Sequence, residues 1–208
     1  MDAVRGLAEY LRYGIPSLLM LVQDLWSFEV LMLFAGLLGA NYQAVHVIML
    51  STDTLMFQVA MGIAIAVSNK VGNNLGAGQP AVAKTYFKIS LLVTSLFSIT
   101  FIISCTLFRY QIPRIYTTHE ELISIAADIM PLLGLFTGLD IFQGAMSGAI
   151  LSMGYQQFSI YINFISYWVL GLPLTYYCMF TLEFGIYGIW SGMTVGTVIV
   201  GVGYLYKV

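Results

Sequence analysis

The chain has 208 residues, of which 59% are hydrophobic and only 9% are charged, with a net charge of −2. An ordinary soluble domain carries about 25% charged residues, so this composition excludes a soluble globular protein and a disordered chain. No basic run is present, which excludes a nucleic-acid partner. What remains is a polytopic membrane protein that contacts the lipid bilayer.

Six long apolar stretches predict six transmembrane helices. They cover about residues 13–38, 42–68, 89–108, 122–151, 158–182 and 184–206. A spanning helix needs about 20 mostly apolar residues, because lipid offers the backbone no hydrogen-bond partners. Between the second and third stretches, Gly72 to Pro80 predicts a turn, and the residues after it predict a short interfacial helix. We therefore expect an all-α transmembrane bundle that forms a single domain.

Lys and Arg residues fall unequally on the two sides of this predicted bundle. Cytoplasmic loops of membrane proteins carry the excess of Lys and Arg, so the richer side is predicted to be cytoplasmic together with both termini. The richer side receives Arg5, Arg12, Lys70, Lys84, Lys88 and Lys207, and the other receives Arg109 and Arg114.

Three acidic residues inside the predicted spans are candidate functional residues. Asp24 and Glu29 lie in the first span and Asp140 lies in the fourth, and none has a Lys or Arg in its own span. An ionisable side chain at mid-membrane costs about 2.5–3.5 kcal/mol, so it indicates a functional site. Without a cation nearby, such a carboxyl group can take up and release a proton near neutral pH, as a proton-coupled carrier requires. The alternative is that these acids are protonated, hydrogen-bonded packing residues.

Five more side chains are candidates for lining a cavity, namely Trp26, Phe28, His46, Ser51 and Asp53. Trp26 and Phe28 stand beside the first-span acids, where aromatic rings bind organic cations through cation–π contacts or, alternatively, belong to an interface belt. His46 and Asp53 lie in the second span. The alternative for His46 is a hydrogen-bonded packing residue, and for Asp53 it is a helix-boundary residue or a neutral hydrogen-bonding group. No Cys/His cluster indicates a metal, and Ser147 has no histidine in its span, so we expect neither an enzyme nor a cofactor.

Pairs of glycines four residues apart predict close helix packing, because small residues let helices approach in lipid. Pro16, Pro131 and Pro173 inside spans predict bends. The glycine pairs are Gly134 with Gly138, Gly144 with Gly148, and Gly192 with Gly196.

Several segments together resemble the C-terminal half of the multidrug and toxic compound extrusion (MATE) transporters, in their eukaryotic branch. These segments are residues 24–29 (DLWSFE), 33–39 (LFAGLLG), 71–78 (VGNNLGAG), 83–84, 115–118, Asp140 with the following Gly144, Gly148, Gly154 and Gln156, and then 167–168, 171–174 and 188–192. They occur in the family's order along nearly the whole chain.

The resemblance implies helices 7–12 of a twelve-helix fold with two six-helix lobes, so the N-terminal lobe would be the missing partner. It implies antiport of small organic, often cationic, compounds or xenobiotics against protons or sodium, in a plasma or vacuolar membrane, with the coupling ion in place of a cofactor. By position, Glu29 and Asp140 match acids tied to cation coupling, and Asp24 matches a further acid of the animal members.

The chain also departs from the family. Ser51 stands where animal members often carry a glutamate, with Asp53 two residues later, and His46 and Ala60 replace a usual glutamine and a frequent proline. Two other functions stay open. One is a lipid-linked saccharide flippase of similar architecture, which calls for a basic cavity that these spans do not offer. The other is a truncated membrane fragment that transports nothing.

Overall fold

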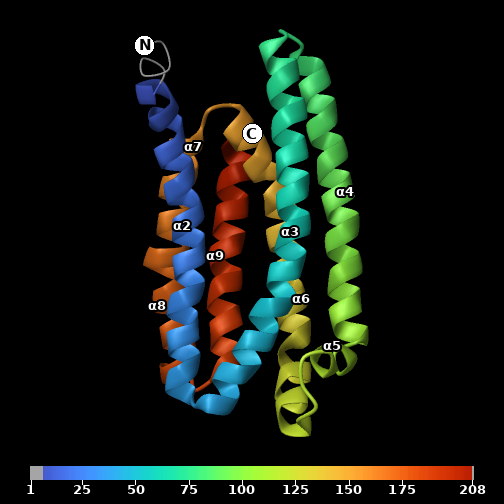
Figure 1. The fold of residues 1–208 in the computed structure, drawn as a ribbon, viewed down its shortest axis with the longest axis vertical. Helices are drawn as coiled ribbons and strands as arrows, with labels where there is room; N and C mark the ends of the chain where they lie inside the picture. Colours follow the sequence, from blue (N-terminus) through green and yellow to red (C-terminus); the bar gives the residue numbers. More distant parts are fainter. Residues whose placement is uncertain (1–6, 208) are drawn as a thin grey trace.

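The structure is a computed structural model that describes residues 7–207, apart from the side chains at positions 8, 9, 12, 13, 16, 17, 20, 21 and 24. Helices make up this part of the chain, and the long ones run side by side along one direction (Figure 1). In chain order the helices are α2 (Leu7–Leu38), α3 (Ala40–Gly76), α4 (Pro80–Leu107), α5 (Gln111–Arg114), α6 (Glu120–Ser152), α7 (Gln156–Asn163), the π-helical segment η1 (Phe164–Gly171), α8 (Leu172–Tyr176), a second π-helical segment η2 (Tyr177–Thr181) and α9 (Ile186–Lys207).

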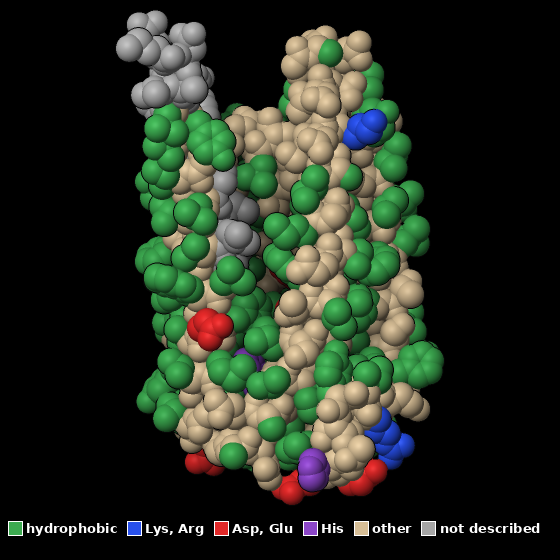
Figure 2. Space-filling model, viewed as in Figure 1, with side chains coloured by type: hydrophobic (Ala, Val, Ile, Leu, Met, Phe, Trp, Pro, Cys, Tyr) green, Lys and Arg blue, Asp and Glu red, His purple; other side chains and the backbone are tan. Residues whose placement is uncertain are grey.

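The predicted spans coincide with these helices. Within residues 7–207, five helices are long and apolar enough to cross a membrane, namely Ala40–Gly76, Pro80–Leu107, Glu120–Ser152, Gln156–Thr181 and Ile186–Lys207. The first predicted span falls in α2, whose described apolar part is Leu25–Leu38. On the face seen in Figure 2, hydrophobic side chains cover the middle of the molecule, whereas most of the charged groups lie towards its ends. The prediction of an all-α membrane protein is confirmed.

The connection between α3 and α4 corrects one prediction. Helix α3 continues to Gly76 and α4 begins at Pro80, so the turn is shorter than predicted. The residues expected to form a short interfacial helix are the first turns of α4. The chain reverses at Gly78, whose φ of +70° favours glycine, and the N–H of Gly78 donates to the Leu75 carbonyl at 3.0 Å. Both helices extend beyond the apolar stretches, because a helix satisfies its own backbone in water as well as in lipid.

The span that contains Pro173 is not a regular α-helix. The π-helical segments η1 and η2 flank the short α8, which has Pro173 in its first turn. Proline removes one backbone donor, and π-helical turns are a known adjustment within helices. Around Pro173, where the sequence predicts a bend, the helix changes between π- and α-helical geometry.

Helix α6 lies at the centre of the bundle and packs against α3, α4 and α9. In its most apolar part 56% of the residues are buried inside the protein, against 17% in α4, so α4 is peripheral. The ends also differ: the α3–α4 turn lies at the same end as the start of α2, and α5 lies at the opposite end (Figure 1). Lys70 and Lys84 therefore lie at one end and Arg114 at the other, as the loop charges predict.

The glycine pairs of α6 face two different neighbours. A Cβ added at Gly134 would lie 2.7 Å from the Cβ of Cys105, so the first pair faces α4. A Cβ added at Gly148 would lie 2.9 Å from the carbonyl carbon of Ala64, so the second pair, Gly144 and Gly148, faces α3. Real Cβ atoms do not approach this closely, so the predicted close packing is confirmed and glycine is required for it.

Candidate functional site

A pocket of about 330 Å³ lies between α3, α6, α7 and α9. One carboxylic acid, Asp140, is among its described lining residues, and none of these residues is Lys, Arg or His. The lining consists of Phe57, Ala60, Met61, Ala64, Ile65, Ser68, Asn69, Asp140, Gln143, Gly144, Ser147, Leu151, Asn163 and Tyr204. The described part of the lining thus carries an acidic group and no basic one.

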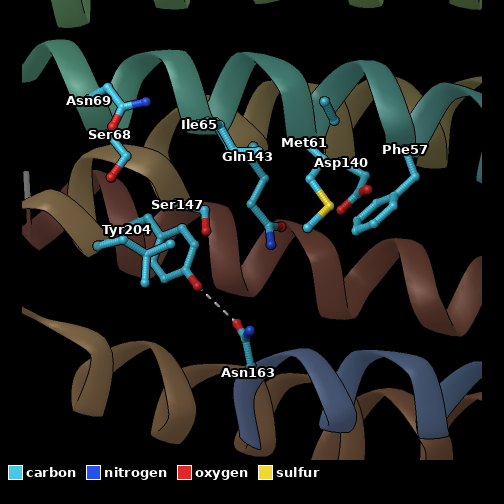
Figure 3. A pocket seen from close by; sticks show the side chains of 14 residues that line it. Phe57, Met61, Ile65, Ser68, Asn69, Asp140, Gln143, Ser147, Asn163 and Tyr204 are labelled. Carbon is cyan, nitrogen blue, oxygen red and sulfur yellow. Dashed lines mark hydrogen bonds between the residues drawn. The ribbon is translucent and has the colours of Figure 1, made fainter. Parts of the chain in front are cut away.

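One wall of the pocket is polar and comes from α6. Asp140, Gln143 and Ser147 are three and four residues apart, which places them on one face of the helix over a length of about 10 Å. The three side chains extend into the space between α3 and α9 (Figure 3). A carboxyl group, an amide and a hydroxyl group therefore follow one another along a single wall.

The neighbouring wall is apolar and comes from α3. Phe57, Met61 and Ile65 recur every four residues and so share a face of this helix. Ser68 and Asn69 continue the same helix at one end of the pocket (Figure 3). The site therefore suits a ligand with one polar and one apolar side.

A buried hydrogen bond holds the side of the pocket formed by α7 and α9. The hydroxyl of Tyr204 donates to the side-chain oxygen of Asn163 at 3.2 Å, and these residues are 0% and 1% exposed (Figure 3). Because both groups are out of water, this bond fixes the two helices relative to each other.

Of the three predicted intramembrane acids, the structure places Asp140 in the pocket. Glu29 lies exposed on α2 and is not among the residues that line it. The side chain of Asp24 lies outside the described residues. Trp26 is 62% exposed on the surface of α2, as a lipid-facing aromatic residue would be, and does not line the pocket.

Two predicted cavity residues pack instead in an aromatic cluster in the core. Trp190 is fully buried, with its ring centre 5.5 Å from that of His46 and 5.4 Å from that of Phe136. Phe28 meets Phe136 edge to face at 6.1 Å. His46 and Phe28 are thus placed as packing residues, the alternative weighed for the histidine from the sequence.

Asp53 and Ser51 are also engaged within the bundle. Asp53 is 4% exposed and accepts a 2.6 Å hydrogen bond from the hydroxyl of Thr137, which links α3 to α6. Ser51 donates to the carbonyl of Val47 in its own helix at 2.7 Å. Neither side chain is part of the pocket lining. Among the residues that the structure describes, no group of three His, Cys, Asp or Glu side chains is arranged to hold a metal ion.

Sequence reasoning missed most of the residues around Asp140. Gln143 carries no charge and gave no signal of its own, and Ser147 was considered only as a nucleophile. Helical spacing identifies both residues, because Gln143 and Ser147 follow Asp140 by three and seven positions and therefore lie on the same face of the helix. Asn163 and Tyr204 reach the site from two other helices, and only their packing reveals them.

The sequence of this chain matches a known protein family and several of its members. The MatE family model matches residues 16–177. The chain is 30% identical over 205 residues to multidrug and toxin extrusion protein 1 of Homo sapiens, covering 99% of this chain and 36% of that protein. It is 34% identical over 203 residues to protein DETOXIFICATION 1 of Arabidopsis thaliana, covering 95% of this chain and 42% of that protein.

The fold comparison agrees with the sequence comparison. The crystal structure of the eukaryotic MATE transporter AtDTX14 superposes with a TM-score of 0.93 at 29% identity, over 100% of this chain and 47% of that one. An outward-facing MATE family transporter of the MOP superfamily has the same fold, with a TM-score of 0.86 at 16% identity. The chain thus spans less than half the length of these relatives.

Proposed function

Since this chain belongs to the MatE family, we propose that it forms the C-terminal six-helix lobe of a secondary active transporter that exports organic cations. The names of its relatives, multidrug and toxin extrusion protein and DETOXIFICATION, support export of small foreign compounds. The chain covers only 36–47% of the length of three relatives. This supports an N-terminal lobe as the partner of this lobe in the full-length transporter. We assign transport and not catalysis, because the relatives are transporters.

The observation that carries the proposal is the charge of the pocket. Asp140 is half-buried in a membrane-spanning helix, and the described lining adds no Lys, Arg or His to oppose a positive ligand. An organic cation gains the attraction of this carboxylate, which is stronger away from bulk water. The partly exposed ring of Phe57 adds an aromatic surface of the kind that binds cations.

The same carboxyl group supports coupling to an ion gradient. A proton bound to Asp140 removes the negative charge that holds an organic cation, so proton and substrate compete for one site. Glu29 is a second acid for this exchange, as the resemblance implies. Sodium is the alternative coupling ion. Coupling to protons or to sodium requires no further cofactor.

Orientation and location follow from the loop charges and the relatives. The end that carries Lys70 and Lys84 is proposed to face the cytoplasm, together with both termini, because cytoplasmic loops are rich in these residues. A plasma or vacuolar membrane fits an exporter of foreign compounds. The flippase alternative is disfavoured, since an anionic headgroup would meet an acidic and not a basic pocket.

The test is the substitution Asp140→Asn in the full-length transporter. Purified protein in liposomes is given a pH gradient, and uptake of a fluorescent organic cation is measured, with a sodium gradient as a separate arm. We expect at least a tenfold loss of gradient-driven uptake. Asp128→Asn is the matched control, because Asp128 is exposed on the same helix and lies outside the pocket lining. Undiminished uptake by Asp140→Asn contradicts the proposal.

A further inference from the structure

The pocket contains a buried polar atom whose bonding capacity is unused. Gln143 is 8% exposed, and within the part of the chain that the structure describes its side-chain oxygen has no hydrogen-bond partner. Buried polar groups in proteins are nearly always paired, and an unpaired one is costly. A ligand that donates a hydrogen bond to this amide would remove that cost.

The position of Gln143 determines what such a ligand must look like. Gln143 is one helical turn from Asp140 on the same wall, and both side chains point into the pocket (Figure 3). The side-chain oxygen of Gln143 can only accept hydrogen bonds, so it is a second acceptor on the wall that carries the Asp140 carboxyl group. A cation that pairs with Asp140 therefore has its charged group within reach of a second acceptor.

Organic cations differ in whether they can use this acceptor. Protonated amines and guanidinium groups carry N–H donors, whereas quaternary ammonium groups carry none. A quaternary ion gains the attraction of Asp140 but leaves the Gln143 oxygen unpaired in a buried place. A site built to hydrogen-bond one substrate rejects an analogue without the donor for this reason.

We propose that Gln143 is a specificity-determining residue that makes this pocket favour organic cations bearing an N–H donor over quaternary ammonium ions. The inference rests on the proposed function, since it requires a cation held at Asp140. The expected preference is about tenfold or more, the typical effect of one hydrogen bond to a charged donor.

The test compares two cations of matched size and charge. Benzyldimethylammonium carries one N–H, and benzyltrimethylammonium carries a methyl group in its place. Their dissociation constants for the purified full-length transporter in detergent are measured by isothermal titration calorimetry at pH 7. Equilibrium binding avoids the leak of the neutral amine through a membrane. The wild-type protein is expected to bind benzyldimethylammonium about tenfold more tightly.

Variants test whether Gln143 causes the difference in affinity between the two cations. In Gln143→Leu the ratio of the two dissociation constants should fall towards one, mainly through weaker binding of benzyldimethylammonium. Gln143→Glu keeps an acceptor oxygen and should keep the preference. Gln58→Leu is the matched control, because Gln58 is exposed on α3 and does not line the pocket. It should bind both cations as the wild-type protein does.

The outcomes separate this inference from the function on which it rests. Equal affinities in the wild-type protein overturn the inference whether or not any variant folds, as does an unchanged ratio in Gln143→Leu. If both cations bind equally and Asp140→Asn weakens both, the proposed cation site stands and only the role of Gln143 fails. If neither cation binds, or Asp140→Asn weakens neither, the proposed function itself fails.

Discussion

Replacing Gly148 by alanine should force α6 away from α3. An added Cβ would lie 2.9 Å from the carbonyl carbon and 3.0 Å from the Cα of Ala64, and closer still to its carbonyl oxygen. These are backbone atoms, so no side-chain rotation relieves the contact. To reach ordinary van der Waals distance the two helices must separate by about 0.5 Å or more, and a gap of this size forfeits about a quarter of the attraction across the interface.

The size of the effect follows from two opposing terms. Overpacking of this kind destabilises proteins by about 1–3 kcal/mol, whereas alanine in place of glycine favours a helix by about 1 kcal/mol. Because the contact is with backbone, we expect the upper part of the first range and a net loss of about 1–2 kcal/mol. Gly62→Ala is the matched control, since Gly62 lies in α3 with no atom within 4 Å of an added Cβ. This control gains helix propensity without a clash and should be neutral or slightly stabilising.

Buried cysteines provide the assay. Cys105 and Cys178 are free and only 0% and 8% exposed, so a fluorogenic maleimide reacts with them as the bundle unfolds. Thermal unfolding of the intact protein in detergent should show a midpoint lower by about 2–8 °C for Gly148→Ala, taking about 2–4 °C per kcal/mol. A midpoint for Gly148→Ala equal to or above that of Gly62→Ala would refute the packing argument, because the backbone contact would then cost nothing.

The remaining predictions concern two buried hydrogen bonds between helices and use the same thermal assay. Thr137→Val should destabilise the protein by about 1–3 kcal/mol, because it leaves the buried carboxyl group of Asp53 without its 2.6 Å donor. Thr137→Ser keeps the hydroxyl group and should lose clearly less. Tyr204→Phe should lose about 1 kcal/mol with the bond to Asn163. If Tyr204→Phe has the midpoint of the wild-type protein, this bond does not hold α9 against α7.

Sequence alone determined the helices and their order. Lipid forces the backbone to pair within each helix, so an uninterrupted apolar stretch is both a necessary and a visible signal. The same logic singled out Asp140, because a carboxyl group in such a stretch is costly. One boundary was misjudged, between residues 69 and 88, because a helix that leaves the bilayer keeps its hydrogen bonds while its composition turns polar.

Only the tertiary structure decided which side chains meet. In a soluble protein the apolar face of a helix shows which side is buried, but here lipid and protein interior are both apolar. The pattern therefore did not reveal that Phe28 and His46 turn into an aromatic core while Trp26 stays on the surface. Nor did it reveal the pocket partners Gln143 and Tyr204. The composition identifies a membrane bundle with a buried acid, and the packing of four helices around that acid makes it a candidate cation site.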